Sequence, residues 1–133
     1  MVELNFLKMK IIIPGVEEII EINKILGGNV INKSNLEFLS SKILSKYKDK
    51  DQKKQIAKIA AIFWMDIIQG HPFVDGNKRT AFGTVELFLD KNKYNLETPL
   101  SGKVFMSLKI ANSDITYDEI VEWIFQRLKV SKQ

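Results

Sequence analysis

The chain has 133 residues, of which 45% are hydrophobic and 27% charged, so size and composition predict one globular domain, over residues 1–133, with a core of its own. Because it has no cysteine and one histidine, the sequence excludes disulfides and thiol nucleophiles and argues against a zinc site. The formal net charge of +4 comes from interspersed lysines and acids, which argues against nucleic acid as a partner.

Apolar residues recur at helical spacing in the first third of the chain and predict a helix over residues 16–26, ended by two glycines. Residues 29–33 are short, β-prone and flanked by turn formers, so they predict a small hairpin or an extended flap. Ser34 or Asn35 is then expected to cap a helix that runs to about residue 47.

The middle of the chain predicts two long helices joined by a sharp turn. The first, over residues 51–69, begins at an aspartate that can cap it, and its second half is apolar nearly all round. Such a helix is typical of the centre of a domain. Pro72 predicts extended geometry for His71. Asn77 is then expected to cap the second helix, over residues 78–92.

The last third predicts a loop over residues 94–101 and two helices, over 102–111 and 117–128. Thr116 and Glu119 fit the capping box that opens the second of them. No stretch is long and apolar enough for a membrane span or a secretory signal. We therefore expect a compact all-α domain with a short hairpin, in a cytoplasmic protein without a membrane partner.

One run of ten residues, HPFVDGNKRT at 71–80, gathers groups suited to phosphate chemistry. The N–H groups at the start of the helix after Asn77 have no partners within that helix, and together with the helix dipole they attract anions. Gly76 permits positive φ and the close approach of a ligand. Lys78 and Arg79 add positive charge, and arginine can bind two phosphate oxygens at once.

Two further residues of the run complete this set. Asp75 offers an oxygen ligand suited to Mg²⁺, which is usually held by one or two carboxylates and substrate phosphates. An unperturbed histidine, with a pKa of about 6.5, can take a proton from a hydroxyl near neutral pH, so His71 is the candidate base. Phe73 is expected to pin the turn to the core. The set describes a transferase that moves part of a nucleotide onto a hydroxyl.

Each of these residues alone has a simpler interpretation. A lone histidine at a helix end is usually solvated or hydrogen-bonded, and an Asp-Gly pair is a turn. An asparagine there is a helix cap, and the two cations are surface charges. The functional hypothesis therefore depends on their joint occurrence, in this order, where a buried helix ends and another begins.

The run matches HPFx(D/E)GN(K/G)R and resembles the signature of the Fic/Doc family, with every fixed position present. The resemblance extends from about residue 16 to residue 96. It implies the family's helical fold and the binding of ATP, or a related nucleotide, with Mg²⁺. The implied roles are a base at His71, a Mg²⁺ ligand at Asp75, and an anion hole with phosphate contacts at Gly76, Asn77 and Arg79. The implied target-binding flap, which pairs with an extended segment of the target, consists of Val30, Ile31, Asn32 and Lys33.

Lys78 distinguishes two branches within this resemblance. Adenylyl-transferring members have glycine there, whereas Doc-like (death-on-curing) members have lysine and move the terminal phosphate of ATP to a hydroxyl of elongation factor Tu. The chain therefore resembles the Doc-like branch. Because Pro72 and Gly76 also occur in the adenylylating form, protein adenylyl transfer remains an alternative, as does a non-catalytic nucleotide-binding module. The inhibitory pattern (S/T)xxxE(G/N) of some members is missing, so any inhibition is expected to come from a separate antitoxin protein.

Overall fold

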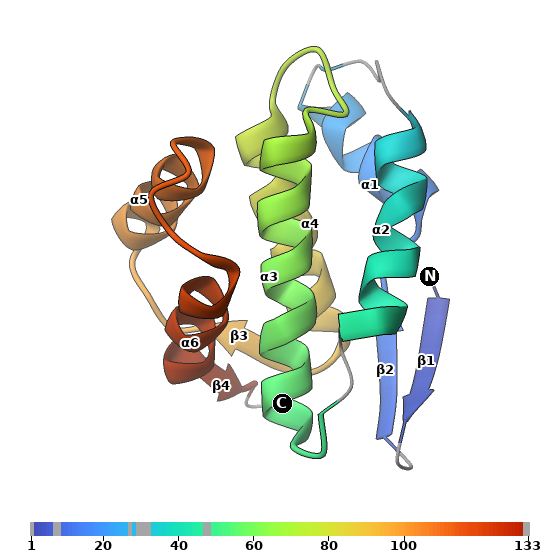
Figure 1. Ribbon diagram of the computed structural model, residues 1–133, viewed down its shortest axis with the longest axis vertical. Coiled ribbons are helices and arrows are strands. Elements are labelled where there is room, and N and C mark those ends of the chain that lie inside the picture. The colour runs from blue at the N-terminus through green and yellow to red at the C-terminus, as the bar shows by residue number, and fades with distance from the viewer. Residues whose placement is uncertain (1, 7–8, 27, 29–32, 47–48, 132–133) are drawn as a thin grey trace.

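The computed structural model describes residues 2–6, 9–26, 28, 33–46 and 49–131, which form six helices and four short strands (Figure 1). The helices are α1 (Val16–Ile25), α2 (Lys33–Lys46), α3 (Gln52–Gly70), α4 (Asn77–Lys91), α5 (Leu100–Ala111) and α6 (Tyr117–Arg127). The strands are β1 (Val2–Phe6), β2 (Met9–Ile13), β3 (Tyr94–Leu96) and β4 (Leu128–Val130). The predicted helical fold class is confirmed, and no helix in this part of the chain is long and apolar enough to cross a membrane.

α3 lies in the middle of the domain beside α4, with α5 and α6 on one side and α1 and α2 on the other (Figure 1). Its second half is buried, as the apolar run predicts: Phe63 and Trp64 are 1% and 0% exposed. The Phe63 ring packs against Phe88 of α4 at a centroid distance of 5.7 Å, and the Trp64 indole N–H donates to Ser107 Oγ of α5 at 2.9 Å. Because α3 and α4 are packed together, the turn that joins them is held at one end of the domain.

Two antiparallel strand pairs accompany the helices. β1 pairs with β2, and Asn92 after α4 holds β2 by accepting from Ile12 N at 2.9 Å and donating to Ile12 O at 2.7 Å. β3 pairs with β4, so the predicted loop over residues 94–101 and the predicted helical end at Leu128 are wrong. The reason is a long-range contact: Leu96 and Leu128 are partners in the register and are only 9% and 1% exposed.

The structure tests only part of the predicted flap. Val30, Ile31 and Asn32 lie outside the described residues, whereas Lys33 is the first residue of α2, so the extended geometry predicted for it is wrong. Its role in target binding stays a prediction. α2 begins before Ser34 and Asn35, so neither is the cap that the sequence predicts. The Asn35 side chain instead contacts α3. Its Nδ2 donates to the Gly70 carbonyl at the end of α3, at 2.6 Å. The hairpin that the structure does describe is β1–β2, near the N-terminus.

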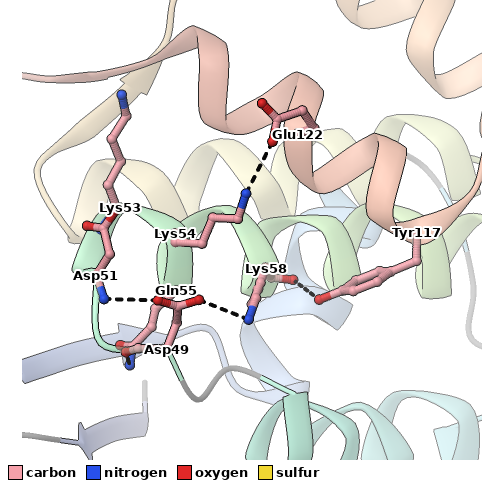
Figure 2. A network of polar contacts seen from close by, with 8 residues as sticks. All are labelled: Asp49, Asp51, Lys53, Lys54, Gln55, Lys58, Tyr117 and Glu122. Atoms are coloured by element: carbon pink, nitrogen blue, oxygen red, sulfur yellow. Dashed lines mark hydrogen bonds and ion pairs between the residues drawn. The ribbon is translucent and has the colours of Figure 1, made fainter.

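Charged side chains secure the start of α3, which is shown in Figure 2. Asp51 caps the helix, as predicted, by accepting from the Lys53 amide at 3.1 Å. Asp49 accepts from the Asp51 amide at 3.0 Å and pairs with Lys58 at 3.1 Å, and these contacts lower the pKa of the Asp49 carboxyl. Lys58 therefore has an acidic partner just before the start of its own helix.

The start of α6 is a capping box, as predicted. Thr116 Oγ1 accepts from Glu119 N at 3.2 Å, and Glu119 Oε1 accepts from Thr116 N at 3.0 Å, which lowers the pKa of the Glu119 carboxyl. We expect Thr116→Ala to lower the free energy of unfolding by about 1 kcal/mol, measured by urea denaturation. Because the folded state lowers that pKa, the difference should shrink as the pH falls through the lowered value. Ser101→Ala, at an exposed position of α5, is the control, and an equal loss there would contradict the capping role.

Candidate functional site

The ten-residue run lies at the turn between α3 and α4, at one end of the domain (Figure 1). α1 approaches the same turn, since Asn23 contacts both Asp75 and Thr80. Six of the predicted site residues come together here, in the turn or the first turn of α4: His71, Asp75, Gly76, Asn77, Lys78 and Arg79. The predicted nucleotide and magnesium contacts are therefore concentrated on a single segment.

His71 closes α3 in the left-handed conformation, with φ 45° and ψ 55°, so the predicted extended geometry is wrong. Pro72 disfavours a right-handed continuation of the helix, and a left-handed residue reverses the chain at once. A non-glycine residue in this conformation is strained, and such strain clusters at functional sites. The imidazole side chain is exposed and has no hydrogen-bond partner among the described residues, which leaves it open to a bound molecule.

The turn itself is fastened to the core by Phe73, which is 1% exposed, as predicted. Asn77 binds the backbone of the same residue: its Oδ1 accepts from Phe73 N at 3.1 Å, and its Nδ2 donates to Phe73 O at 3.0 Å. Asn77 is thus the first residue of α4, with Gly76 in the cap position, and its predicted role as the helix cap is wrong. Its amide group is engaged in shaping the turn.

The first turn of α4 carries amide groups that are available to an anion. Gly76 precedes it with φ 77°, a left-handed conformation that glycine adopts without strain. Thr80 N donates to the Gly76 carbonyl at 2.8 Å and begins the helical hydrogen bonds. The amides of Asn77, Lys78 and Arg79 have no acceptor in the part of the chain that the structure describes. Together with the positive end of the helix dipole, these amides can bind a phosphate.

Asp75 lies across this anion-binding turn. Its Oδ1 accepts from Gly76 N at 2.8 Å, and its Oδ2 lies 4.0 Å from Arg79 Nη2. The carboxylate thus contacts two groups that are suited to a phosphate. The Arg79 and Asp75 side chains are 61% and 84% exposed, and exposed ion pairs contribute little free energy. An incoming anion can therefore replace the carboxylate at low cost.

Magnesium fits this arrangement when phosphates supply its other ligands. Among the described residues, no group of three or more His, Asp or Glu side chains could hold a metal ion alone. Asp75 offers one exposed carboxylate, which matches the usual set for Mg²⁺ of one or two carboxylates with substrate phosphates. The donor set therefore fits Mg²⁺ that is bound together with a nucleotide.

A cleft lies away from this turn, along α4, β3 and β4. It has a volume of about 920 Å³, and its lining includes Phe82, Glu86, Asp90, Tyr94, Lys103 and Lys129. None of the ten motif residues lines it. We place the candidate site at the α3–α4 turn because groups that are able to bind a phosphate and accept a proton are gathered there, whereas the cleft walls carry both signs of charge without such a set.

One residue of this site was not anticipated from the sequence. Asn23, in α1, is 1% exposed, and its Nδ2 donates to the Asp75 carbonyl at 3.0 Å and to Thr80 Oγ1 at 2.9 Å. A signal for it existed: Asn23 follows Ile19 and Ile20 at helical spacing and so falls on the apolar face of its helix. A polar residue at such a position is buried and needs a partner, which here is the motif turn.

A comparison with curated proteins gave no match. The family model described as Fic/DOC family matches residues 16–89, which is more than half of the chain and includes the whole α3–α4 turn. With the fold and the motif in agreement with that match, the chain belongs to the Fic/DOC family.

Proposed function

We propose that this chain is a Doc-like protein kinase, which transfers the γ-phosphate of ATP to a hydroxyl of a target protein. The Fic/DOC family is known for protein-modifying transferases. The observation that carries the choice of branch is Lys78, an exposed lysine in the first turn of α4, where the resemblance gives the adenylyl-transferring members a glycine.

A physical argument supports the same choice. The Lys78 side chain adds a positive charge and bulk beside the amides that open α4. A glycine at this position would leave that space to phosphates. With the lysine present, we expect the nucleotide to bind in the opposite direction, so that its γ-phosphate, and not its α-phosphate, meets the acceptor.

In the proposed reaction, each residue of the turn has one role. The α4 amides and Arg79 hold the phosphate oxygens, and Asp75 is the residue that would hold Mg²⁺, which would neutralise phosphate charge. His71 takes the proton from the target hydroxyl as the oxygen forms a bond to the γ-phosphorus. The bond from that phosphorus to the bridging oxygen breaks, and ADP leaves with the electron pair.

The protein partners are proposed on the resemblance. The target is elongation factor Tu or a similar protein that presents a hydroxyl in an extended segment. Because the sequence has no inhibitory (S/T)xxxE(G/N) pattern, control is assigned to a separate antitoxin chain. Co-expression with the neighbouring reading frame tests that assignment, with relief of growth arrest as the expected result and undiminished arrest as the contradictory one.

Two labels on ATP distinguish the possible chemistries. The purified protein is incubated with a bacterial extract and either γ-labelled or α-labelled ATP, and protein-bound label is measured. We expect label from γ-labelled ATP only. Lys78→Gly should reduce γ-transfer and shift the product towards adenylylation. Lys91→Gly, at an exposed lysine in the last turn of the same helix, is the matched control and should leave the product unchanged.

The other outcomes have defined meanings. Protein-bound label from α-labelled ATP alone would replace the kinase proposal with adenylyl transfer. No transfer of either label, by a folded protein that binds Mg·ATP, would favour a non-catalytic nucleotide-binding module. A product that is the same for the wild type and Lys78→Gly would show that residue 78 does not set the direction of nucleotide binding.

A further inference from the structure

We infer that Asn23 is a positioning residue for the phosphate-binding turn, because it fixes the orientation of the peptide group between Asp75 and Gly76. The inference rests on the proposed function in so far as that turn binds Mg·ATP. Asn23 belongs to α1 and lies 52 residues before Asp75 in the sequence. Its Nδ2 donates to the Asp75 carbonyl at 3.0 Å, which joins a separate helix to the middle of the motif.

The geometry of a trans peptide gives this contact its consequence. The C=O and N–H of a planar trans peptide point in opposite directions, and none of the described peptide bonds is cis. Because Asn23 binds the Asp75 carbonyl, the N–H of Gly76 points away from α1. It donates to the Asp75 carboxylate at 2.8 Å, on the side where Arg79 lies 4.0 Å from the same carboxylate. Asn23 therefore directs the Gly76 N–H to the place where a phosphate oxygen would replace that carboxylate.

The rest of the Asn23 environment holds its side chain in one position. The second Nδ2 hydrogen bond goes to Thr80 Oγ1 at 2.9 Å, and the side chain is buried. Gly28 covers it closely: a Cβ at this glycine would lie 2.2 Å from Asn23 Oδ1 and 2.5 Å from Nδ2. A side chain at residue 28 would therefore occupy the space that the Asn23 amide fills.

Stability alone does not explain an asparagine here. Asn23 Oδ1 is buried and has no hydrogen-bond partner among the described residues, and an unpaired buried polar atom is costly. An apolar residue of similar size would remove that cost. What it would also remove is the donor to the Asp75 carbonyl, which is the contact that orients the turn.

Asn23→Leu separates the two roles, because leucine has a similar volume and no donor. We expect the folded variant to bind Mg·ATP about tenfold more weakly, as measured by calorimetry. Its thermal unfolding midpoint should stay close to that of the wild type, because leucine fills the same space without an unpaired polar atom. Thr80→Val is the matched control. It removes the other acceptor of the same Nδ2 group, leaves the Asp75 contact in place, and should keep the affinity within about twofold of the wild type. Equal affinities for Asn23→Leu and the wild type, or equal losses in both variants, would overturn the inference.

A second arm needs no nucleotide. In ¹H–¹⁵N spectra of the free protein, Asn23→Leu should shift the Gly76 amide resonance and speed its hydrogen exchange, whereas Thr80→Val should not. If Asn23→Leu fails to fold, Gly28→Ala takes its place, because the added Cβ would displace the Asn23 amide. An unchanged Gly76 amide in folded Asn23→Leu, or in the Gly28→Ala variant that replaces it, overturns the inference. A wild type that binds no Mg·ATP, but whose Gly76 amide responds to these substitutions, contradicts the proposed function and leaves the positioning role supported.

Discussion

Replacing His71 by alanine is expected to lower the rate of phosphate transfer by about 10²–10⁴-fold, the range that a general base contributes. The imidazole is exposed and makes no hydrogen bond to the described residues, so its removal should leave the fold unchanged. The affinity for Mg·ATP should stay within about twofold of the wild type, because the proposed phosphate contacts come from α4 and not from His71. Single-turnover transfer of γ-label and calorimetric titration with Mg·ATP measure the two quantities separately.

Two other substitutions make this result specific. Val74→Ala alters another exposed side chain of the same turn, 65% accessible, and should leave the transfer rate near that of the wild type. Arg79→Ala should weaken Mg·ATP binding by about tenfold or more, since a hydrogen bond to a charged group contributes roughly 1.5–3 kcal/mol. If His71→Ala lost affinity in the manner of Arg79→Ala, His71 would be a phosphate contact and not the base.

The parts of the fold that follow from the sequence are those set by neighbours along the chain. The apolar run of α3 specifies a buried helix because every face of it is apolar, and Phe63 and Trp64 are indeed in the core. Asp51 and Thr116 cap their helices because a cap needs only an amide two or three residues later. The gathering of the six motif residues at one turn follows in the same way, since they are adjacent in sequence.

What the sequence did not predict depends on contacts between distant segments. β3 and β4 are three residues each, and they exist because Leu96 and Leu128 are buried together across more than thirty residues of chain. His71 is left-handed although the residue before a proline favours extended geometry, because the chain must reverse after α3 for Phe73 to reach the core. Asn23 was missed because it lies in α1, whereas its partners lie in the α3–α4 turn and at the start of α4, more than fifty residues later.

Phe73→Ala is expected to have the largest effect on stability, a loss of about 3–5 kcal/mol in the free energy of unfolding. The ring is 1% exposed, and its removal leaves a cavity under the turn that carries the site. Urea denaturation measures the loss, which is a large share of the roughly 5–15 kcal/mol that stabilises an ordinary domain. Phe105→Ala, at a phenylalanine of α5 that is 61% exposed, is the matched control and should change stability by about 0.5 kcal/mol at most.

The functional consequence of Phe73→Ala distinguishes an anchor of the site from an ordinary core residue. Asn77 binds both the N–H and the carbonyl of Phe73, so a backbone that shifts at residue 73 also pulls on the first residue of α4. We therefore expect the folded fraction of Phe73→Ala to bind Mg·ATP more weakly. Phe63→Leu, a substitution in the core of α3 away from the turn, should lower stability without that change in affinity. The contrary result is that both variants keep the wild-type affinity once it is corrected for the folded fraction. In that case the two hydrogen bonds from Asn77 to Phe73 would be enough to hold the turn, and the Phe73 ring would contribute to stability only.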